Sequence, residues 1–139
     1  MDLYVSGSVV DWGMARVDDF RELRVYQAAF ALQQQVFETT RSFPRDERYS
    51  LTDQIRRSSR SVGANIAEAW QKRRYPAHFA SKLTDADAEA AETRHWLHTA
   101  QACGYLDAEI RADLDRQTRE VGKMLGAMIR DAPRWCSPH

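Results

Sequence analysis

The sequence has little cysteine and no long apolar run. Only Cys103 and Cys136 occur among its 139 residues. No segment approaches the roughly 18 uninterrupted apolar residues that indicate a membrane-spanning helix, and the first residues lack the basic stretch and apolar run of an export signal. These absences predict a cytoplasmic chain with reduced thiols and no membrane contact.

The chain also lacks a net charge. Its 20 basic side chains are balanced by 20 acidic ones, so a signal for nucleic acid or membrane must come from uneven distribution along the chain. With 43% hydrophobic and 29% charged residues, the composition is typical of one globular domain with a real core. No strand-like alternation of polar and apolar residues is present, so we expect an all-α fold.

Four segments show apolar residues at helical spacing. The first begins between residues 18 and 25 and ends near residue 42, and its inward stripe is Val25, Ala29, Leu32 and Val36. The third is the most regular, and its seam is Phe79, Leu83, Ala86, Ala90, Thr93, Leu97 and Ala100. Gly104 is expected to end this helix in a left-handed conformation.

The second and fourth helices have recognisable ends and less regular seams. Ser50 and Asp53 resemble a capping box, and the seam that follows is Leu51, Ile55, Ser58, Val62, Asn65 and Ala69. Gly63 predicts a bend or a close approach near the middle of this helix. Asp107 is expected to cap the fourth helix. Its stripe is Ile110, Leu114, Gln117, Val121, Met124 and Met128, and Leu125 and Ile129 widen it.

These segments predict one domain with two irregular ends. We expect a flexible N-terminal leader at 1–17, a helical bundle at 18–132 and a C-terminal tail at 133–139, with Pro133 ending the ordered part. Short connections between helices of about 25 residues favour an antiparallel up-down-up-down four-helix bundle.

Several short motifs occur in a distinctive order along the chain. They are Phe43-Pro44, Glu47-Arg48-Tyr49-Ser50-Leu51-Thr52, Gln54-Ile55-Arg56-Arg57, Asn65-Ile66-Ala67-Glu68, Glu92-Thr93 and Gly104-Tyr105-Leu106. Together they resemble the bacterial four-helix-bundle family named after proteins encoded in intervening sequences of 23S ribosomal RNA genes. The chain departs from that family's pattern at Ala69-Trp70, where a glycine usually follows the glutamate, and at Asp85-Ala86-Asp87. The resemblance implies a ring-like homopentamer, similar to the accessory variability protein of diversity-generating retroelements, which binds nucleic acid and reverse transcriptase.

The second helix and its flanks are the one region with surplus positive charge. Residues 45–74 hold eight basic and four acidic side chains, whereas residues 77–103 hold two basic and four acidic ones. Arginines on a rigid helix suit phosphate contacts, and the candidate nucleic-acid contacts are Arg56, Arg57, Arg60, Lys72, Arg73 and Arg74. Trp70 and Tyr75 are candidates for stacking on bases. The alternative is pairing of these arginines with carboxylates such as Asp85, Asp87 or Glu89, within the chain or across a subunit interface.

Two surfaces are candidates for contacts between subunits. Tyr26, Phe30 and Phe37 form a second apolar stripe on the first helix, beside the inward one. On the second helix, Gly63 and Ala67 lie at the centre of a stripe that leaves room for another helix. The alternatives are a broad core face for the first surface and an exposed face without a role for the second.

No arrangement of residues predicts catalysis or a cofactor. Glu92 and His95 match only half of the motif of di-iron bundles, and Cys136 with His139 supplies only two metal ligands. Within the Asn65-to-Glu68 motif we expect a structural role, because a buried asparagine at a seam can fix register. We therefore predict a non-enzymatic, homo-oligomeric scaffold that binds nucleic acid; the alternative is a protein–protein interaction scaffold with no nucleic-acid role.

Overall fold

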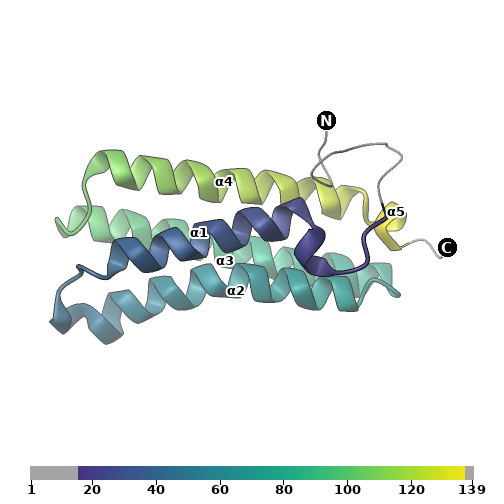
Figure 1. Ribbon diagram of the computed structural model, residues 1–139, viewed down its shortest axis with the longest axis horizontal. Helices are drawn as coiled ribbons and strands as arrows, with labels where there is room; N and C mark the ends of the chain where they lie inside the picture. Colours follow the sequence, from purple (N-terminus) through teal and green to yellow (C-terminus); the bar gives the residue numbers. More distant parts are fainter. Residues whose placement is uncertain (1–15, 137–139) are drawn as a thin grey trace.

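The computed structural model describes residues 16–136, and every element in this range is helical. Four long helices lie side by side along the long axis of the molecule (Figure 1): α1 (Arg24–Thr40), α2 (Asp53–Gln71), α3 (Pro76–Ala102) and α4 (Ala108–Arg130). Shorter elements are η1 (Phe20–Glu22), η2 (Arg45–Glu47), η3 (Arg48–Thr52) and α5 (Ala132–Cys136). The prediction of an all-α fold is confirmed, while most of the predicted leader, at 1–15, lies outside the described residues.

The connections between the long helices gather at two ends of the molecule. The α1–α2 and α3–α4 turns lie at one end, and the α2–α3 turn, the start of α1 and α5 lie at the other (Figure 1). α2 packs most extensively against α3, and α1 packs against both α2 and α4. Within residues 16–136, no helix combines the length and the apolar character needed to cross a membrane.

The interior is filled by the stripes that the sequence predicts for α1 and α3. Val25, Ala29, Leu32 and Val36 are all buried, together with Thr40. The buried residues of α3 are the seven predicted ones: Phe79, Leu83, Ala86, Ala90, Thr93, Leu97 and Ala100. Complete burial of a leucine or phenylalanine contributes about 1.5 to 3 kcal/mol, so these two stripes account for much of the folding energy.

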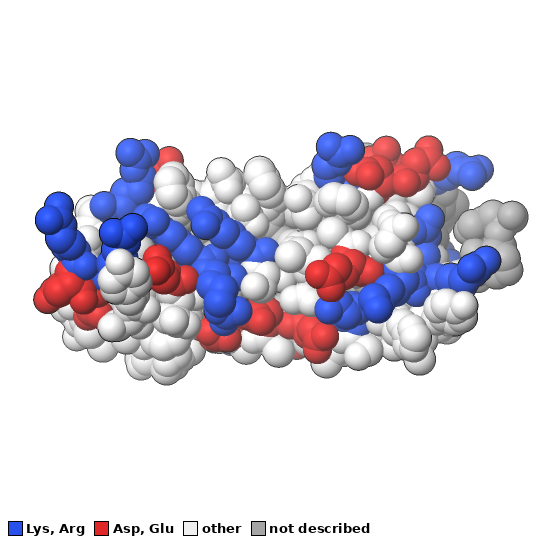
Figure 2. Space-filling view, turned by 90° about the horizontal axis from the view of Figure 1, so that it is seen from below, with Lys and Arg blue, Asp and Glu red and all other residues white. Residues whose placement is uncertain are grey.

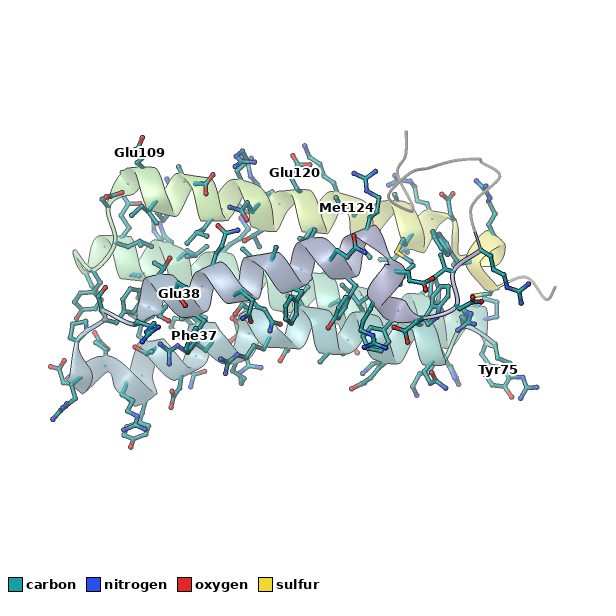
Figure 3. The ribbon with its side chains drawn as sticks, viewed as in Figure 1. Phe37, Glu38, Tyr75, Glu109, Glu120 and Met124 are labelled. Atoms are coloured by element: carbon teal, nitrogen blue, oxygen red, sulfur yellow. The ribbon has the colours of Figure 1, made fainter. Side chains whose placement is uncertain are left out.

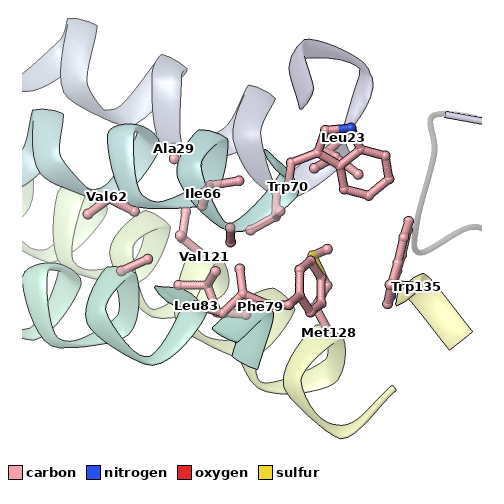
Figure 4. Packing of buried hydrophobic residues seen from close by; sticks show 14 of the residues in the cluster. Leu23, Ala29, Val62, Ile66, Trp70, Phe79, Leu83, Val121, Met128 and Trp135 are labelled. Carbon is pink, nitrogen blue, oxygen red and sulfur yellow. The ribbon is translucent and has the colours of Figure 1, made fainter. Parts of the chain in front are cut away.

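The core consists of two apolar clusters along the bundle. One includes Trp70, Phe79, Met128 and Trp135 (Figure 4), and the other includes Leu32, Leu51, Ile55, Leu97 and Leu114. In both α2 and α3 a buried hydroxyl lies between the two clusters. The Oγ of Ser58 and the Oγ1 of Thr93 are 2.9 Å apart and hydrogen-bonded, so these buried polar groups are satisfied.

The helix ends agree with the sequence at α3 and α4 and differ at α2. Gly104 has a φ of 82°, and the backbone N–H of Ile110 donates to Asp107 Oδ1 at 2.8 Å, which confirms both predicted ends. The prediction of a capping box at Ser50 is wrong. Residues 48–52 are already a turn of π-helix, and the backbone N–H of Asp53 donates to the carbonyl of Arg48, so the start of α2 needs no side-chain cap.

The inward stripe of α4 is shifted by one position over part of its length. Leu114, Val121 and Met128 are buried as predicted, and so is Leu125, which was expected to widen the stripe. Thr118 takes the place expected for Gln117, and Met124 is only partly buried. The amide of Gln117 instead exchanges hydrogen bonds of 2.9 and 3.0 Å with Gln35 of α1. Ile110 is 44% exposed, so the predicted stripe is wrong at its first position too.

The prediction that Pro133 ends the ordered part is wrong. Pro133 lies in the first turn of α5, where its missing N–H costs no intrahelical hydrogen bond. Trp135 in the same short helix is only 6% exposed and packs in the apolar cluster of Figure 4. Residues 137–139 of the predicted tail lie outside the described residues.

Candidate nucleic-acid interface

Lysine and arginine side chains gather in two places on the molecular face shown in Figure 2. One gathering lies toward the α1–α2 turn and the other toward the α2–α3 turn. We call the first the arginine end and define it as Arg41, Arg45, Arg48, Arg56, Arg57 and Arg60. We call the second the tryptophan end and define it as Trp70, Lys72, Arg73, Arg74 and Trp135.

Phe37 organises three guanidinium groups at the arginine end. The Cζ atom of Arg56 lies 4.8 Å from the centroid of the Phe37 ring, and those of Arg41 and Arg60 lie 5.7 Å from it. Phe37 comes from the last part of α1, facing α2 (Figure 3). Each cation–π contact contributes about 0.5 to 1 kcal/mol at an exposed site. The ring therefore holds three positive charges close together.

Arg56 is further fixed by a hydrogen bond, and it borders a cleft. Its Nε donates to the Thr40 hydroxyl at 2.8 Å. The cleft has a volume of about 490 Å³, and its lining residues are Asp53, Arg56, Arg57, Arg60, Ser61 and Ala64. Within the described part of the chain, neither Arg56 nor Arg60 has a carboxylate oxygen within 4.0 Å. Their charges are thus held in place without being neutralised.

Arg57, between them in sequence, is neutralised by α3. Its Nη2 lies 2.6 Å from Glu92 Oε2, and its Nη1 lies 3.4 Å from Glu89 Oε1. The hydrogen bond to Glu92 raises the pKa of Arg57. The pKa of Glu92 is lowered by the same bond and by the indole N–H of Trp96, which donates to it at 3.0 Å. The alternative of pairing within the chain is therefore realised for Arg57.

At the tryptophan end, Arg73 packs on a ring that belongs to the core. Arg73 Cζ lies 4.0 Å from the Trp70 ring centroid, and its Nη1 donates to the Trp70 carbonyl at 2.8 Å. Trp70 is 6% exposed and meets Trp135 edge to face at 5.9 Å. The expectation that Trp70 stacks on bases is therefore wrong, because its ring is in the core. Lys72 and Arg74 are exposed, and Tyr75 is 56% exposed at this end (Figure 3).

The residues predicted for subunit contacts differ in accessibility. Tyr26 packs edge to face on Phe20 at 4.9 Å, and its Cε1 would lie 3.4 Å from a Cβ placed on Gly63. The close approach predicted at Gly63 is thus made by the chain's own α1. Ala67 is partly buried. Phe30 is 44% exposed, so it is the most accessible member of the predicted aromatic stripe.

The Asn65-to-Glu68 motif lies on α2 with its polar side chains outside the seam. Asn65 is only partly buried, and its Nδ2 donates to the Ser61 carbonyl of its own helix at 2.9 Å. The expectation of a buried asparagine at the seam is wrong, because Ile66 takes the inward position. Glu68 lies 2.7 Å from Lys82 Nζ of α3, and this bond raises the pKa of Lys82.

The candidate metal ligands do not converge. Glu92 is bound by Arg57 and Trp96 as described above, and His95 is exposed with its ring edge to face with Trp96 at 4.7 Å. Burial raises the pKa of the Cys136 thiol, while His139 lies outside the described residues. Among residues 16–136, no group of three or more metal-ligating side chains comes together.

Comparison with known proteins identifies the family. Residues 21–127 match the family described as 23S rRNA-intervening sequence protein. The chain belongs to this family. A similar solved structure is described as a protein with unknown function from the S23 ribosomal protein family of Bacteroides thetaiotaomicron. The two are 27% identical with a TM-score of 0.69, over 76% of this chain and 95% of the other. No protein with a curated description matches the chain.

Part of the arginine end was not predicted from the sequence. Arg41 was not predicted, although its position four residues after Phe37 places the two side chains on one side of α1. Arg45 and Arg48 were included among the basic residues of 45–74 but were not predicted as nucleic-acid contacts. The role of Phe37 under the arginines of α2 was missed because it depends on how α1 and α2 pack.

Proposed function

We propose that this chain is a non-enzymatic, homo-oligomeric scaffold that binds nucleic acid through the arginine end. The observation that carries the proposal is the contrast between neighbouring arginines on α2. Arg57 is paired with Glu89 and Glu92, whereas Arg56 and Arg60 are held over Phe37 beside an open cleft. Two ordered guanidinium groups without carboxylate partners suit an external anion.

Phosphate is the anion that fits this arrangement best. A guanidinium group is planar and donates two parallel hydrogen bonds to a phosphate group. Because Phe37 and Thr40 already restrict Arg56, less side-chain freedom is lost on binding. Contacts to the backbone carry no base sequence, so we propose binding with little sequence preference and a steep dependence on salt.

We propose that the chain is an antiparallel up-down-up-down bundle in the cytoplasm and that five copies form a ring. The placement of the turns at alternate ends supports the topology (Figure 1). The pentamer is an inference from the family resemblance, and the accessible ring of Phe30 supports a subunit contact on α1. Repetition around a ring would multiply the arginine end and bring several phosphate sites onto one particle.

Replacing Arg56 and Arg60 together by glutamine tests the proposal while sparing the paired Arg57. We expect the variant to bind a mixed-sequence RNA or DNA more weakly and with a flatter salt dependence, because two phosphate contacts per chain are lost. Light scattering should give about five times the 16.0 kDa chain mass for both proteins. Unchanged binding by the variant, or no binding by the unaltered protein at low salt, would contradict nucleic acid as the partner. A monodisperse monomer in light scattering would contradict the ring.

A protein–protein interaction scaffold without a nucleic-acid role is the second candidate. It is favoured by the outer surface of α1, since residues 25–37 contain no charged side chain and Phe30 stacks on Tyr26 at 6.1 Å while remaining 44% exposed. Under this alternative, Phe30→Ser would abolish capture of the partner protein, and the Arg56 and Arg60 variant would retain it.

A further inference from the structure

Tyr49 is an unusually exposed aromatic side chain at the arginine end. It is 72% exposed, more than Phe30, Tyr75 or Ile110. It lies in the π-helical turn η3, immediately before α2. The following residues Leu51 and Thr52 are buried and anchor that turn. The ring is therefore displayed by an ordered segment of backbone.

Charges of both signs lie beside Tyr49. Asp46 and Glu47 are acidic, and the Glu47 carboxylate accepts a hydrogen bond of 2.7 Å from the Tyr105 hydroxyl, while Arg45 and Arg48 are basic. The Cζ atom of Arg48 lies 5.4 Å from the ring centroid, and Arg45 in the preceding turn is exposed. An aromatic ring with guanidinium groups beside it is the combination on which unpaired bases stack, because the ring offers a π-surface and the arginines attract the backbone.

Tyr49 is also within reach of the cleft that borders Arg56 and Arg60. It precedes these residues by seven and eleven positions, which correspond to about 10 and 16 Å along a helix at about 1.5 Å per residue. Asp53 lies between Tyr49 and Arg56 in sequence and also lines the cleft. Because its carboxylate repels phosphate, we expect phosphates on the side of the cleft that Arg56 and Arg60 line. A strand with phosphates at Arg56 and Arg60 can thus bring a neighbouring base to Tyr49.

We propose that the arginine end binds single-stranded nucleic acid, with phosphates at Arg56 and Arg60 and an unpaired base stacked on Tyr49. This inference rests on the proposed function and adds the class of nucleic acid. In a duplex the bases are paired and stacked inside the helix, so a lone surface ring cannot use them without unstacking. The phosphate contacts alone would not distinguish the two forms.

Tyr49→Ala tests the inference, with Tyr49→Phe and Tyr75→Ala as controls. The probes are a single-stranded DNA about 12 nucleotides long, the RNA of the same sequence and the corresponding DNA duplex, all at low salt. The unaltered protein should bind the single strands more tightly than the duplex. Tyr49→Ala should weaken single-strand binding by about five-fold or more and leave duplex binding unchanged, whereas both controls should keep single-strand binding. Tyr75 is the matched control because the proposal places no base on it: it is 56% exposed, but it precedes α3 at the end of the bundle away from Arg56 and Arg60.

The outcomes separate this inference from the proposed function. Equal affinity for single strands and duplex, or no effect of Tyr49→Ala in a protein whose binding still depends on Arg56 and Arg60, overturns the inference and leaves the proposed function standing. Absence of binding to all three probes overturns both. A lower particle mass for Tyr49→Ala would show that Tyr49 is a subunit contact and would also overturn the inference; circular dichroism should confirm an unchanged helical content.

Discussion

The two ends of α2 both place arginine against an aromatic ring, and the rings differ in burial. At the tryptophan end, Arg73 covers Trp70, which is 6% exposed and belongs to the core. At the arginine end, Arg56 and Arg60 lie over the half-buried ring of Phe37 and themselves line a cleft. The comparison shows that the position of the ring decides whether the arginine completes the fold or presents a charge.

Arg73 and Arg56 also differ in the helix that accepts their hydrogen bonds. Arg73 donates to the carbonyl of Trp70 in the last turn of α2, where a positive charge stabilises the helix end. Arg56 uses Nε to bind the hydroxyl of Thr40 on α1, one donor of the five in a guanidinium group. Arg73 therefore caps its own helix, whereas Arg56 joins α2 to α1.

Removing the ring at the tryptophan end should have the largest effect. We expect Trp70→Ala to lower the free energy of unfolding by about 3 to 5 kcal/mol, because it opens a cavity beside Trp135 and removes the surface under Arg73. Denaturant unfolding followed by circular dichroism measures this. Tyr75→Ala, at an exposed ring, should stay within about 0.5 kcal/mol. A loss below about 1 kcal/mol for Trp70→Ala would contradict the assignment of this end to the core.

Removing the Phe37 ring at the arginine end should lower the free energy of unfolding less than removing Trp70, and it should also weaken nucleic-acid binding. We expect Phe37→Ala to lower the free energy of unfolding by about 1 to 2 kcal/mol, since the ring is half-buried and its cation–π contacts are weak individually. Nucleic-acid affinity should fall with it, because Arg56 and Arg60 lose their common support. Phe37→Leu should recover most of the stability and little of the affinity. Full affinity in both variants would show that the ring does not position the arginines.

The smallest effect is expected at Arg57. It lies between Arg56 and Arg60 in sequence and, unlike them within residues 16–136, is paired with carboxylates. Arg57→Gln should lower the free energy of unfolding by less than about 1 kcal/mol near neutral pH, since the pair is partly solvated. The bond holds the pKa of Glu92 below its ordinary value of 4.5. Its contribution is therefore present above that value and is lost as the pH falls through the lowered pKa.

Denaturation at a series of acid pH values measures this contribution. The acid decline of stability should be flatter in Arg57→Gln than in the unaltered protein. Glu92→Gln, which removes the titrating group itself, should be flatter as well. An acid decline that is unchanged in both variants would mean that the pair does not act on stability.

The fold was predictable where one helix alone carries the signal. The seam of α3 was predicted completely because small and apolar residues repeat without interruption from Phe79 to Ala100. At α2 the start was missed, since a π-turn rather than the side chain of Ser50 precedes the helix. Ile66 replaced Asn65 in the interior because which of two adjacent positions faces inward depends on packing with α1 and α3.

The candidate site was predictable in composition and not in pairing. The positive surplus of residues 45–74 pointed to Arg56, Arg57 and Arg60 together, as it did to Lys72, Arg73 and Arg74. Adjacent residues on a helix point about 100° apart, so Arg57 reaches the carboxylates of α3 while Arg56 reaches Phe37 and Thr40 of α1. Only the arrangement of three helices decides which arginine is neutralised.

The most direct measurement compares two double variants that each remove two positive charges from one end of α2. One is Arg56→Gln with Arg60→Gln, and the other is Lys72→Gln with Arg74→Gln, both assayed for single-stranded RNA and DNA binding over a range of salt concentrations. If the arginine end is the binding site, the first variant should lose affinity by about ten-fold and show a flatter salt dependence, while the second stays within about three-fold of the unaltered protein. Equal losses in the two variants, or a larger loss in the second, would contradict the assignment of binding to the arginine end.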